Sequence, residues 1–150
     1  MTALIDNLVW EQQHGSGLQR EMGYRLVEWA EDYAVLELVI APRHLNRSGI
    51  LHGGVIATLL DTVSGYACCY CPVQGHLRRS LTLSLTTNFM GQATSGVVRS
   101  IARRQGGGRK IAFTTATAMN EDGEIIASAT GTFRLHRGSE DPRGIARPAD

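Results

Sequence analysis

A histidine, two glycines and a carboxylate within one short stretch could together perform acyl-transfer chemistry. His52-Gly53-Gly54 precedes an apolar segment in which Asp61 is the single charged residue. The first N–H groups of a helix lack internal partners, so they suit a carbonyl oxygen that gathers negative charge. A carboxylate two turns further on could activate a water or attack a carbonyl. A tight turn would explain the glycines alone, and a bond to backbone or to Thr58 would explain the acid alone, but the combination favours catalysis.

The residues from 54 to 70 predict a long helix with two unequal faces. Because residues 48–77 include no Lys, Arg or Glu, we expect this helix, Asp61 included, to be buried on nearly all sides. Small side chains on one face would leave room for a ligand or for a second backbone. The large face comprises Ile56, Leu59, Val63, Tyr66 and Tyr70, and the small face comprises Gly54, Ala57, Thr58, Asp61, Ser64, Gly65 and Cys68.

The pattern of residues 46–61 is specific enough to suggest a family. Asn46-x-x-Gly49-x-x-His52-Gly53-Gly54, followed by Thr58-Leu59-Leu60-Asp61, resembles the signature of the PaaI-like acyl-CoA thioesterases of the hotdog-fold superfamily. Strand-like segments extend the resemblance to about residue 135. The resemblance implies an α+β hotdog fold, in which an antiparallel β-sheet wraps a long central helix. It also implies an enzyme that hydrolyses an acyl-CoA to a free acid and CoA.

The resemblance assigns roles to five residues. The Gly53 N–H would polarise the thioester carbonyl, and Asp61 would act as general base or as nucleophile. Asn46 and His52 would orient the thioester, the water or the loop. Thr82 stands where PaaI-like enzymes often carry a Ser or Thr near the catalytic water. In the family two subunits share each site, which implies a homodimer or a dimer of dimers, a homotetramer. No metal or cofactor is required, because CoA is part of the substrate.

A basic group near three consecutive glycines could bind the phosphates of CoA. The four residues flank the glycines at 106–108 and would lie together at the end of a hairpin if the neighbouring strands pair. A solvated hairpin tip explains the same charges. The group comprises Arg103, Arg104, Arg109 and Lys110.

Two other functions remain open. A hotdog enoyl-thioester hydratase would use a His and an acid on another spacing, and His52 lies too close to the helix start to favour it. A non-catalytic acyl-CoA-binding hotdog protein would bind the thioester without releasing a thiol, although Asp61 argues against it. The acyl group, aromatic or medium to long chain, is also open, because Tyr66, Tyr70 and Phe89 could line a pocket or form core.

The remaining sequence predicts scaffolding for the central helix. We expect a hairpin, then the long helix, then a four-strand meander with a bulge near residues 88–90. Residues 1–136 would form a single domain, with an N-terminal helix within 1–13, and the polar segment 137–150 would be a loosely attached tail. The predicted strands cover residues 24–29, 33–40, 81–86, 97–104, 109–119 and 124–135.

Composition excludes several classes of protein. A formal net charge of +1 over 150 residues indicates neither a nucleic-acid nor an anionic-membrane partner. No apolar run reaches the ~18 residues of a membrane span, and no secretory signal is visible. Cys68, Cys69 and Cys71 are clustered and odd in number, which suits buried thiols in a reducing cytoplasm better than disulfides or zinc. We expect the histidines other than His52, among them His44, to lie on the surface or in loops.

Overall fold

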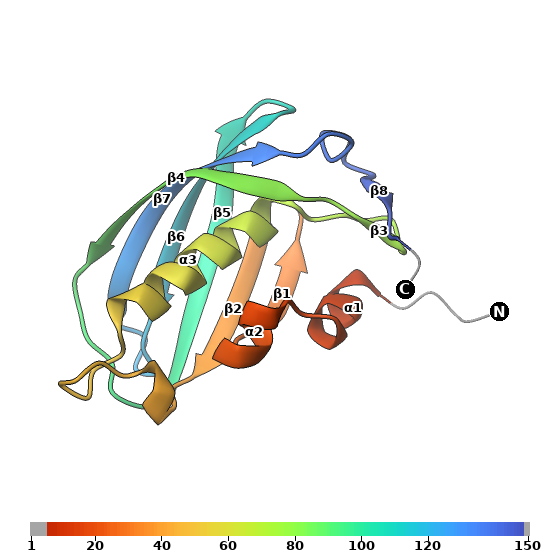
Figure 1. Ribbon diagram of the computed structural model, residues 1–150. Coiled ribbons are helices and arrows are strands. Elements are labelled where there is room, and N and C mark those ends of the chain that lie inside the picture. The colour runs from red at the N-terminus through yellow and green to blue at the C-terminus, as the bar shows by residue number, and fades with distance from the viewer. Residues whose placement is uncertain (1–5, 149–150) are drawn as a thin grey trace.

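A six-stranded antiparallel sheet curves around one long helix in the computed structural model, which describes residues 6–148 (Figure 1). The strand order is β1-β2-β5-β6-β7-β4, and a separate two-stranded sheet joins β3 and β8. The helices are α1 (Asn7–Gln13), α2 (Gly17–Met22), the 3-10 turn η1 (Pro42–His44) and α3 (Gly53–Cys68). The strands are β1 (Arg25–Ala30), β2 (Tyr33–Val39), β3 (His76–Leu77), β4 (Ser80–Phe89), β5 (Val97–Gly107), β6 (Ile111–Met119), β7 (Ile125–Leu135) and β8 (Ile145–Ala146).

Helix α3 packs its large apolar residues against the concave face of the sheet. Ile56, Leu59 and Val63 are buried there, as the helical spacing predicted. The strands opposite present small inward residues, so the helix can lie close to the sheet without leaving voids. These inward residues of β6 and β7 are Ala112, Ala116, Ala118, Ala127, Ala129 and Gly131.

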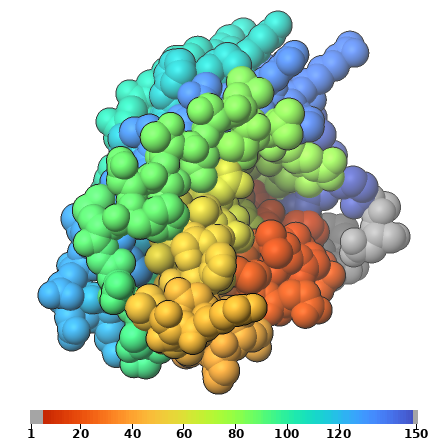
Figure 2. Space-filling model, turned by 60° about the vertical axis from the view of Figure 1, so that its left-hand side comes forward, coloured from red at the N-terminus to blue at the C-terminus, as the bar shows by residue number. Residues whose placement is uncertain are grey.

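The small-residue face of α3 is only partly covered, contrary to the prediction of burial on nearly all sides. Asp61 is half-buried, and Gly54 is exposed. Ser64 and Cys68, which we assigned to the same face, are fully buried, as the prediction required. Figure 2 shows α3, in yellow, reaching the surface as a strip between β4 and the N-terminal helices. The carboxylate therefore lies at the surface of a single chain.

Strand β4 crosses to the far edge of the sheet, so the predicted four-strand meander is wrong. Only β5, β6 and β7 form a meander, whereas β4 pairs with β7. The chain crosses the sheet diagonally as α3 and begins β4 on the other side (Figure 1). The register of β4 shifts between Thr82 and Ser84, and not near residues 88–90 as expected.

The outer edge of β4 has no partner strand within the described residues. The sequence from Ser80 to Val98 contains no charged residue, and Leu81, Leu83 and Phe89 are each more than half exposed. Edge strands of monomeric proteins are normally protected by charges, prolines or bulges. A long, uncharged, apolar edge is therefore suited to pairing with another strand.

The segment after β7 returns to the N-terminal helix, which the expectation of a loose tail did not anticipate. β8 pairs with β3, and the Arg147 guanidinium bonds to Asn7 and lies 4.3 Å from the Trp10 ring centroid. The helix predicted within 1–13 begins at Asn7, and residues 1–5 lie outside the described part of the chain. Helix α2 was not predicted. Between residues 6 and 148, no helix has the length and apolar character needed to cross a membrane.

Candidate active site

Asp61 and Thr82 form a hydrogen-bonded pair between α3 and β4. The Thr82 hydroxyl donates to Asp61 Oδ1 over 2.8 Å. Thr82 faces the helix because it stands opposite Phe133, whose side chain is in the core. Thr58 does not bind the acid, since its hydroxyl donates to the Gly54 carbonyl oxygen. Asp61 Oδ2 has no hydrogen bond to any described residue, so it is free to accept a proton from water or to attack a carbonyl.

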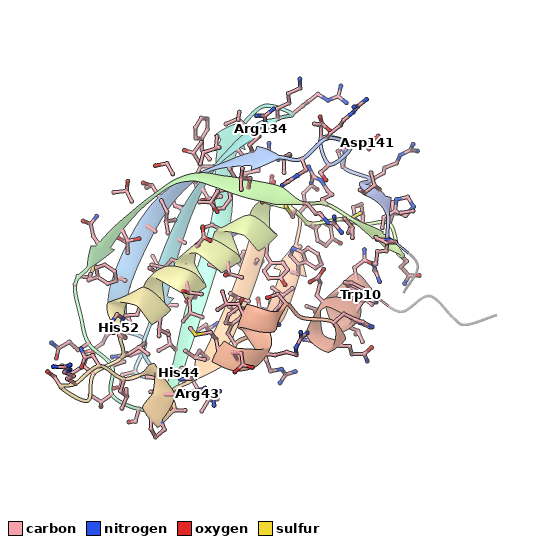
Figure 3. All side chains as sticks on the ribbon, in the orientation of Figure 1. Trp10, Arg43, His44, His52, Arg134 and Asp141 are labelled. Carbon is pink, nitrogen blue, oxygen red and sulfur yellow. The ribbon has the colours of Figure 1, made fainter. Side chains whose placement is uncertain are left out.

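His52 caps the beginning of α3 (Figure 3). Its Nδ1 accepts a hydrogen bond of 2.8 Å from the Gly54 N–H. A nitrogen that accepts carries no proton, so the ring proton of the neutral imidazole lies on Nε2. The exposed Nε2–H can donate to a ligand oxygen. His52 is therefore arranged as a cap and a donor rather than as a base.

The Gly53 N–H is a free donor at the N-terminus of α3. The N–H of Gly54 binds His52, and those of Val55 and Ile56 bind the His52 carbonyl oxygen. Gly53 N–H has no acceptor among the described residues. The ring of Phe89 lies 3.5 Å from the position that a Cβ on Gly53 would occupy. A carbonyl oxygen approaching this donor would meet the positive end of the helix dipole in partly apolar surroundings.

Asn46 organises the loop before α3. Its Oδ1 accepts from the N–H groups of Ser48 and Ile50, at 2.9 and 3.1 Å. Gly49 completes the turn at φ +72°, a conformation that glycine adopts without strain. The side chain of Asn46 thus shapes the loop that leads to His52.

One chain separates the predicted site residues into two half-sites. His52 and Gly53 lie at the beginning of α3 and Asn46 lies in the loop before it, whereas Asp61 lies on the middle turns of the helix, bonded to Thr82 of β4. Gly53 and Asp61 are eight positions apart on the helix, a rise of about 12 Å. One thioester carbonyl cannot contact both at once, so the predicted constellation is not assembled within a single chain.

The four basic residues near the glycines are divided between two hollows: Arg104 and Arg109 line one, Arg109 and Lys110 line the other, and Arg103 lines neither. The Arg103 guanidinium lies 4.5 Å from the Tyr33 ring centroid, and Arg104 donates to the carbonyl oxygens of Gly106 and Gly108. Lys110 instead lies across from Leu135, whose N–H donates to its carbonyl oxygen. Sequence reasoning missed the arginines that this pairing brings near Lys110. The alternation of β7, which points Arg134 outward, was the available signal.

His44, Tyr66 and Tyr70 make structural contacts. His44 is buried, its Nδ1 accepts from the Ala41 N–H, and its Nε2 donates to the Met22 carbonyl oxygen, so the expectation of a surface or loop histidine is wrong. Tyr66 and Tyr70 both pack edge-on against Trp29. These contacts favour core roles for the two tyrosines.

The three cysteines are all buried. Burial raises the pKa of the Cys68 thiol to about 12, which makes it unreactive at neutral pH. Residues 6–148 contain no group of His, Cys, Asp or Glu side chains arranged to hold a metal ion.

The Thioesterase superfamily model matches residues 48–127, more than half of the chain. The chain belongs to this superfamily. Human acyl-coenzyme A thioesterase 13 is 29% identical over 140 residues, covering 90% of this chain and 96% of that protein. The medium/long-chain acyl-CoA thioesterase YigI of Escherichia coli is 29% identical over 136 residues, covering 77% of this chain and 83% of that protein.

Solved structures of the family have the same fold. The E. coli PaaI protein superposes with a TM-score of 0.74 at 20% identity, over 89% of this chain and 96% of that one. Haemophilus influenzae thioesterase HI1161 superposes with a TM-score of 0.77 at 21% identity, over 88% of this chain and 92% of that one. The predicted PaaI-like resemblance and the hotdog fold are therefore confirmed.

Proposed function

We propose that this thioesterase-superfamily protein hydrolyses an acyl-CoA to a free acid and CoA. The observation that carries the proposal is the half-buried Asp61, whose Oδ1 is held by Thr82 while Oδ2 remains available. A carboxylate fixed at one oxygen keeps the other aimed at a bound water or carbonyl. The names of the relatives support an acyl-CoA as the substrate.

The reaction follows from the two half-sites. The thioester carbonyl oxygen accepts from the Gly53 N–H and gathers negative charge during attack. Asp61 either removes a proton from the attacking water or attacks the carbonyl carbon itself, forming an anhydride that water then opens. The carbon–sulfur bond breaks and the thiol of CoA leaves. The Nε2–H of His52 is placed to orient the thioester.

Two copies of the chain complete each site in this proposal. The ~12 Å between Gly53 and Asp61 along one helix requires that the donor and the acid come from different copies. The uncharged outer edge of β4 offers the surface for such a dimer, because antiparallel pairing of two copies of β4 satisfies the exposed backbone groups. Thr82 lies on that strand, so the pairing would bring a second copy next to Asp61.

A thiol-release assay over aromatic, short-chain, medium-chain and long-chain acyl-CoAs tests the proposal. Asp61→Asn removes the charge with little change of shape, and we expect its kcat to fall by about 100-fold or more. Asp122→Asn, in an exposed turn, is the matched control and should keep full activity. Binding of acyl-CoAs without thiol release across the panel would instead indicate a non-catalytic binding protein. Hydration of crotonyl-CoA without hydrolysis would indicate a hydratase, which the capping role of His52 disfavours.

A further inference from the structure

Phe89, near the end of β4, belongs to the half-site at the beginning of α3. Its ring lies 3.5 Å from the position that a Cβ on Gly53 would occupy, and so lies beside the Gly53 N–H. The side chain faces the helix because Phe89 stands opposite Ala127, which is buried. Even so, Phe89 is 54% exposed in a single chain. A thioester carbonyl bound to the Gly53 N–H would therefore have an aromatic ring beside it.

The faces of β4 restrict how two copies of this edge strand can pair (Figure 1). Directly opposite residues of an antiparallel pair point to the same face of the sheet. Two copies of a regularly alternating strand therefore match only if the two-fold axis passes through a residue and not between two residues. In β4, Leu85, Thr87 and Phe89 face the helix, whereas Ser84, Thr86 and Asn88 face outward.

The bulge in β4 favours an axis at Thr86. Each residue then pairs with the one equally far on the other side of Thr86. Because the register of β4 shifts between Thr82 and Ser84, the bulge takes up one residue. Thr82 thus comes opposite the partner's Phe89, and both side chains face the helix. An axis moved by one residue along β4 would shift Phe89 two positions away from Thr82.

We propose that two copies of β4 pair about Thr86, and that the partner's Phe89 forms an apolar wall of the site at Asp61 and selects the acyl group. This inference rests on the proposed function for the reaction. The pairing brings the partner's Gly53, on which the ring of Phe89 lies, to the bonded pair of Asp61 and Thr82. It thereby closes the ~12 Å that separates the two half-sites within one chain.

The wall has a consequence for the substrate. The acyl carbons next to the carbonyl would contact the ring of the partner's Phe89. Residues 80–98, which include all of β4 after its first residue, contain no charged side chain that could pair with a charged acyl group. The site would therefore favour an apolar acyl group over one that carries a carboxylate.

Single cysteines test the register. Directly opposite Cα atoms lie about 4.5–5.5 Å apart, within the range that a disulfide spans. Thr86→Cys should therefore give a covalent dimer on oxidation. Ser84→Cys and Asn88→Cys, on the same exposed face, should not, because each lies about 13 Å from its own copy along the paired strands. The wild type, whose three cysteines are buried, is the control. A covalent dimer of either flanking variant in place of Thr86→Cys would overturn the register.

Acyl-group preference tests the wall. In Phe89→Ala we expect kcat/KM for aromatic and long-chain acyl-CoAs to fall about tenfold or more, because an apolar contact is lost, whereas kcat/KM for acetyl-CoA should stay within about twofold. A merely structural role would lower all of these values alike. Phe113→Ala removes a similarly exposed phenylalanine from the outer face of β6 and is the matched control.

Mixed dimers show from which copy Phe89 acts. When Gly53→Pro chains are combined with Asp61→Asn chains, the one intact site joins Asp61 of the first chain to the Gly53 N–H of the second. Phe89→Ala added to the Asp61→Asn chain should lower the restored activity toward aromatic and long-chain acyl-CoAs about tenfold. The same change added to the Gly53→Pro chain should have no such effect. The reverse result would place Phe89 in the same copy as Asp61 and overturn the proposal.

The outcomes separate this inference from the proposed function. If no acyl-CoA is hydrolysed, calorimetric binding of a long-chain acyl-CoA replaces turnover. A Thr86→Cys dimer together with binding weakened about tenfold in Phe89→Ala would then support the wall, although the proposed function fails. If acyl-CoAs are hydrolysed but Phe89→Ala leaves the acyl preference unchanged, the wall is overturned and the proposed function stands.

Discussion

The Thr82 hydroxyl donates to Asp61 Oδ1 over 2.8 Å and so links the edge strand β4 to the middle of α3. Two features of the sequence meet in this contact: the single acid of the central helix and a hydroxyl on the helix-facing side of the alternating strand after it. The bond fixes the carboxylate plane and leaves Oδ2 unoccupied. It also places the acid next to the uncharged strand edge at which a second copy would join.

Replacing Thr82 by Val removes the hydroxyl and keeps the shape of the side chain. A hydrogen bond to a charged group contributes about 1.5–3 kcal/mol, so we expect the kcat for acyl-CoA hydrolysis to fall by roughly tenfold to a hundredfold. Thr82→Ser keeps the donor and should retain most of the activity. The comparison is made by thiol release at saturating substrate. Equal activity of the Val and Ser variants would remove Thr82 from the mechanism.

Mixing two inactive variants tests whether two chains share one site. Gly53→Pro deletes the N–H donor, and the added Cβ would lie 3.5 Å from the Phe89 ring, an ordinary contact distance. Proline is accepted at the first helical position, and His52 already has the extended backbone that must precede it, at ψ 135°. Asp61→Asn deletes the base. Each variant alone should be inactive, whereas co-refolded mixtures should regain about a quarter of the wild-type activity, because half of the dimers then contain one intact site.

The complementation has a clear negative outcome. If both groups act within one chain, no mixture restores activity, since every chain lacks one of them. Light scattering on the same samples reports whether dimers formed. A 16.3 kDa species with full wild-type activity would contradict the shared site directly.

Local patterns predicted the elements of this fold better than their arrangement. The alternation of residues 81–86 identified β4, but its pairing with β7 depends on where α3 leaves the sheet, which no local pattern encodes. The segment after residue 136 has the composition of a loose tail. It is placed by contacts of Arg147 with Asn7 and Trp10, about 140 positions earlier in the chain.

In the candidate site, too, residues with a local sequence signal were predictable, and residues brought together by strand pairing were not. Asp61, Gly53 and His52 could be identified from the sequence. An acid is unusual inside an apolar helix, and so is a His-Gly pair at its beginning. The proximity of Lys110 to Arg134 could not be predicted, because the two become neighbours only when β6 pairs with β7. The free edge of β4 followed from topology, and so did the importance of Thr82 as the partner of Asp61.

Two glycines of α3 should respond oppositely to replacement by alanine. At Gly65 a Cβ would meet nothing closer than 3.8 Å, so Gly65→Ala should raise the free energy of unfolding by about 0.5–1 kcal/mol. At Gly54 a Cβ would lie 3.0 Å from His52 Nδ1, so Gly54→Ala should displace the cap and lower stability by about 1 kcal/mol. Urea denaturation followed by circular dichroism measures both. The same sign for the two variants would contradict the structure around the cap.

The carboxyl of Glu11 should make the protein less stable as pH rises. A carboxyl whose pKa is lowered by folding has the opposite effect. Burial raises the pKa of its carboxyl above the ordinary value of 4.5, although the Tyr66 hydroxyl, which donates to it over 3.0 Å, and the charge of Arg147 oppose the shift. Above pH 4.5 the unfolded chain loses this proton while the folded chain still holds it, so the Glu11 contribution to the free energy of unfolding falls as pH rises toward the raised pKa.

Glu11→Gln should therefore raise the melting temperature at pH 7 and leave it unchanged below pH 4.5, where both states carry a neutral carboxyl. The amide can still accept from Tyr66, so the variant changes the charge and keeps the contact. Glu21→Gln, on the exposed side of α2, is the matched control and should not shift the melting temperature in this way. The measurement is a series of thermal melts between pH 4 and pH 8. A variant that is less stable than the wild type at pH 7 would show that the buried carboxylate stabilises the contact between α1 and α3.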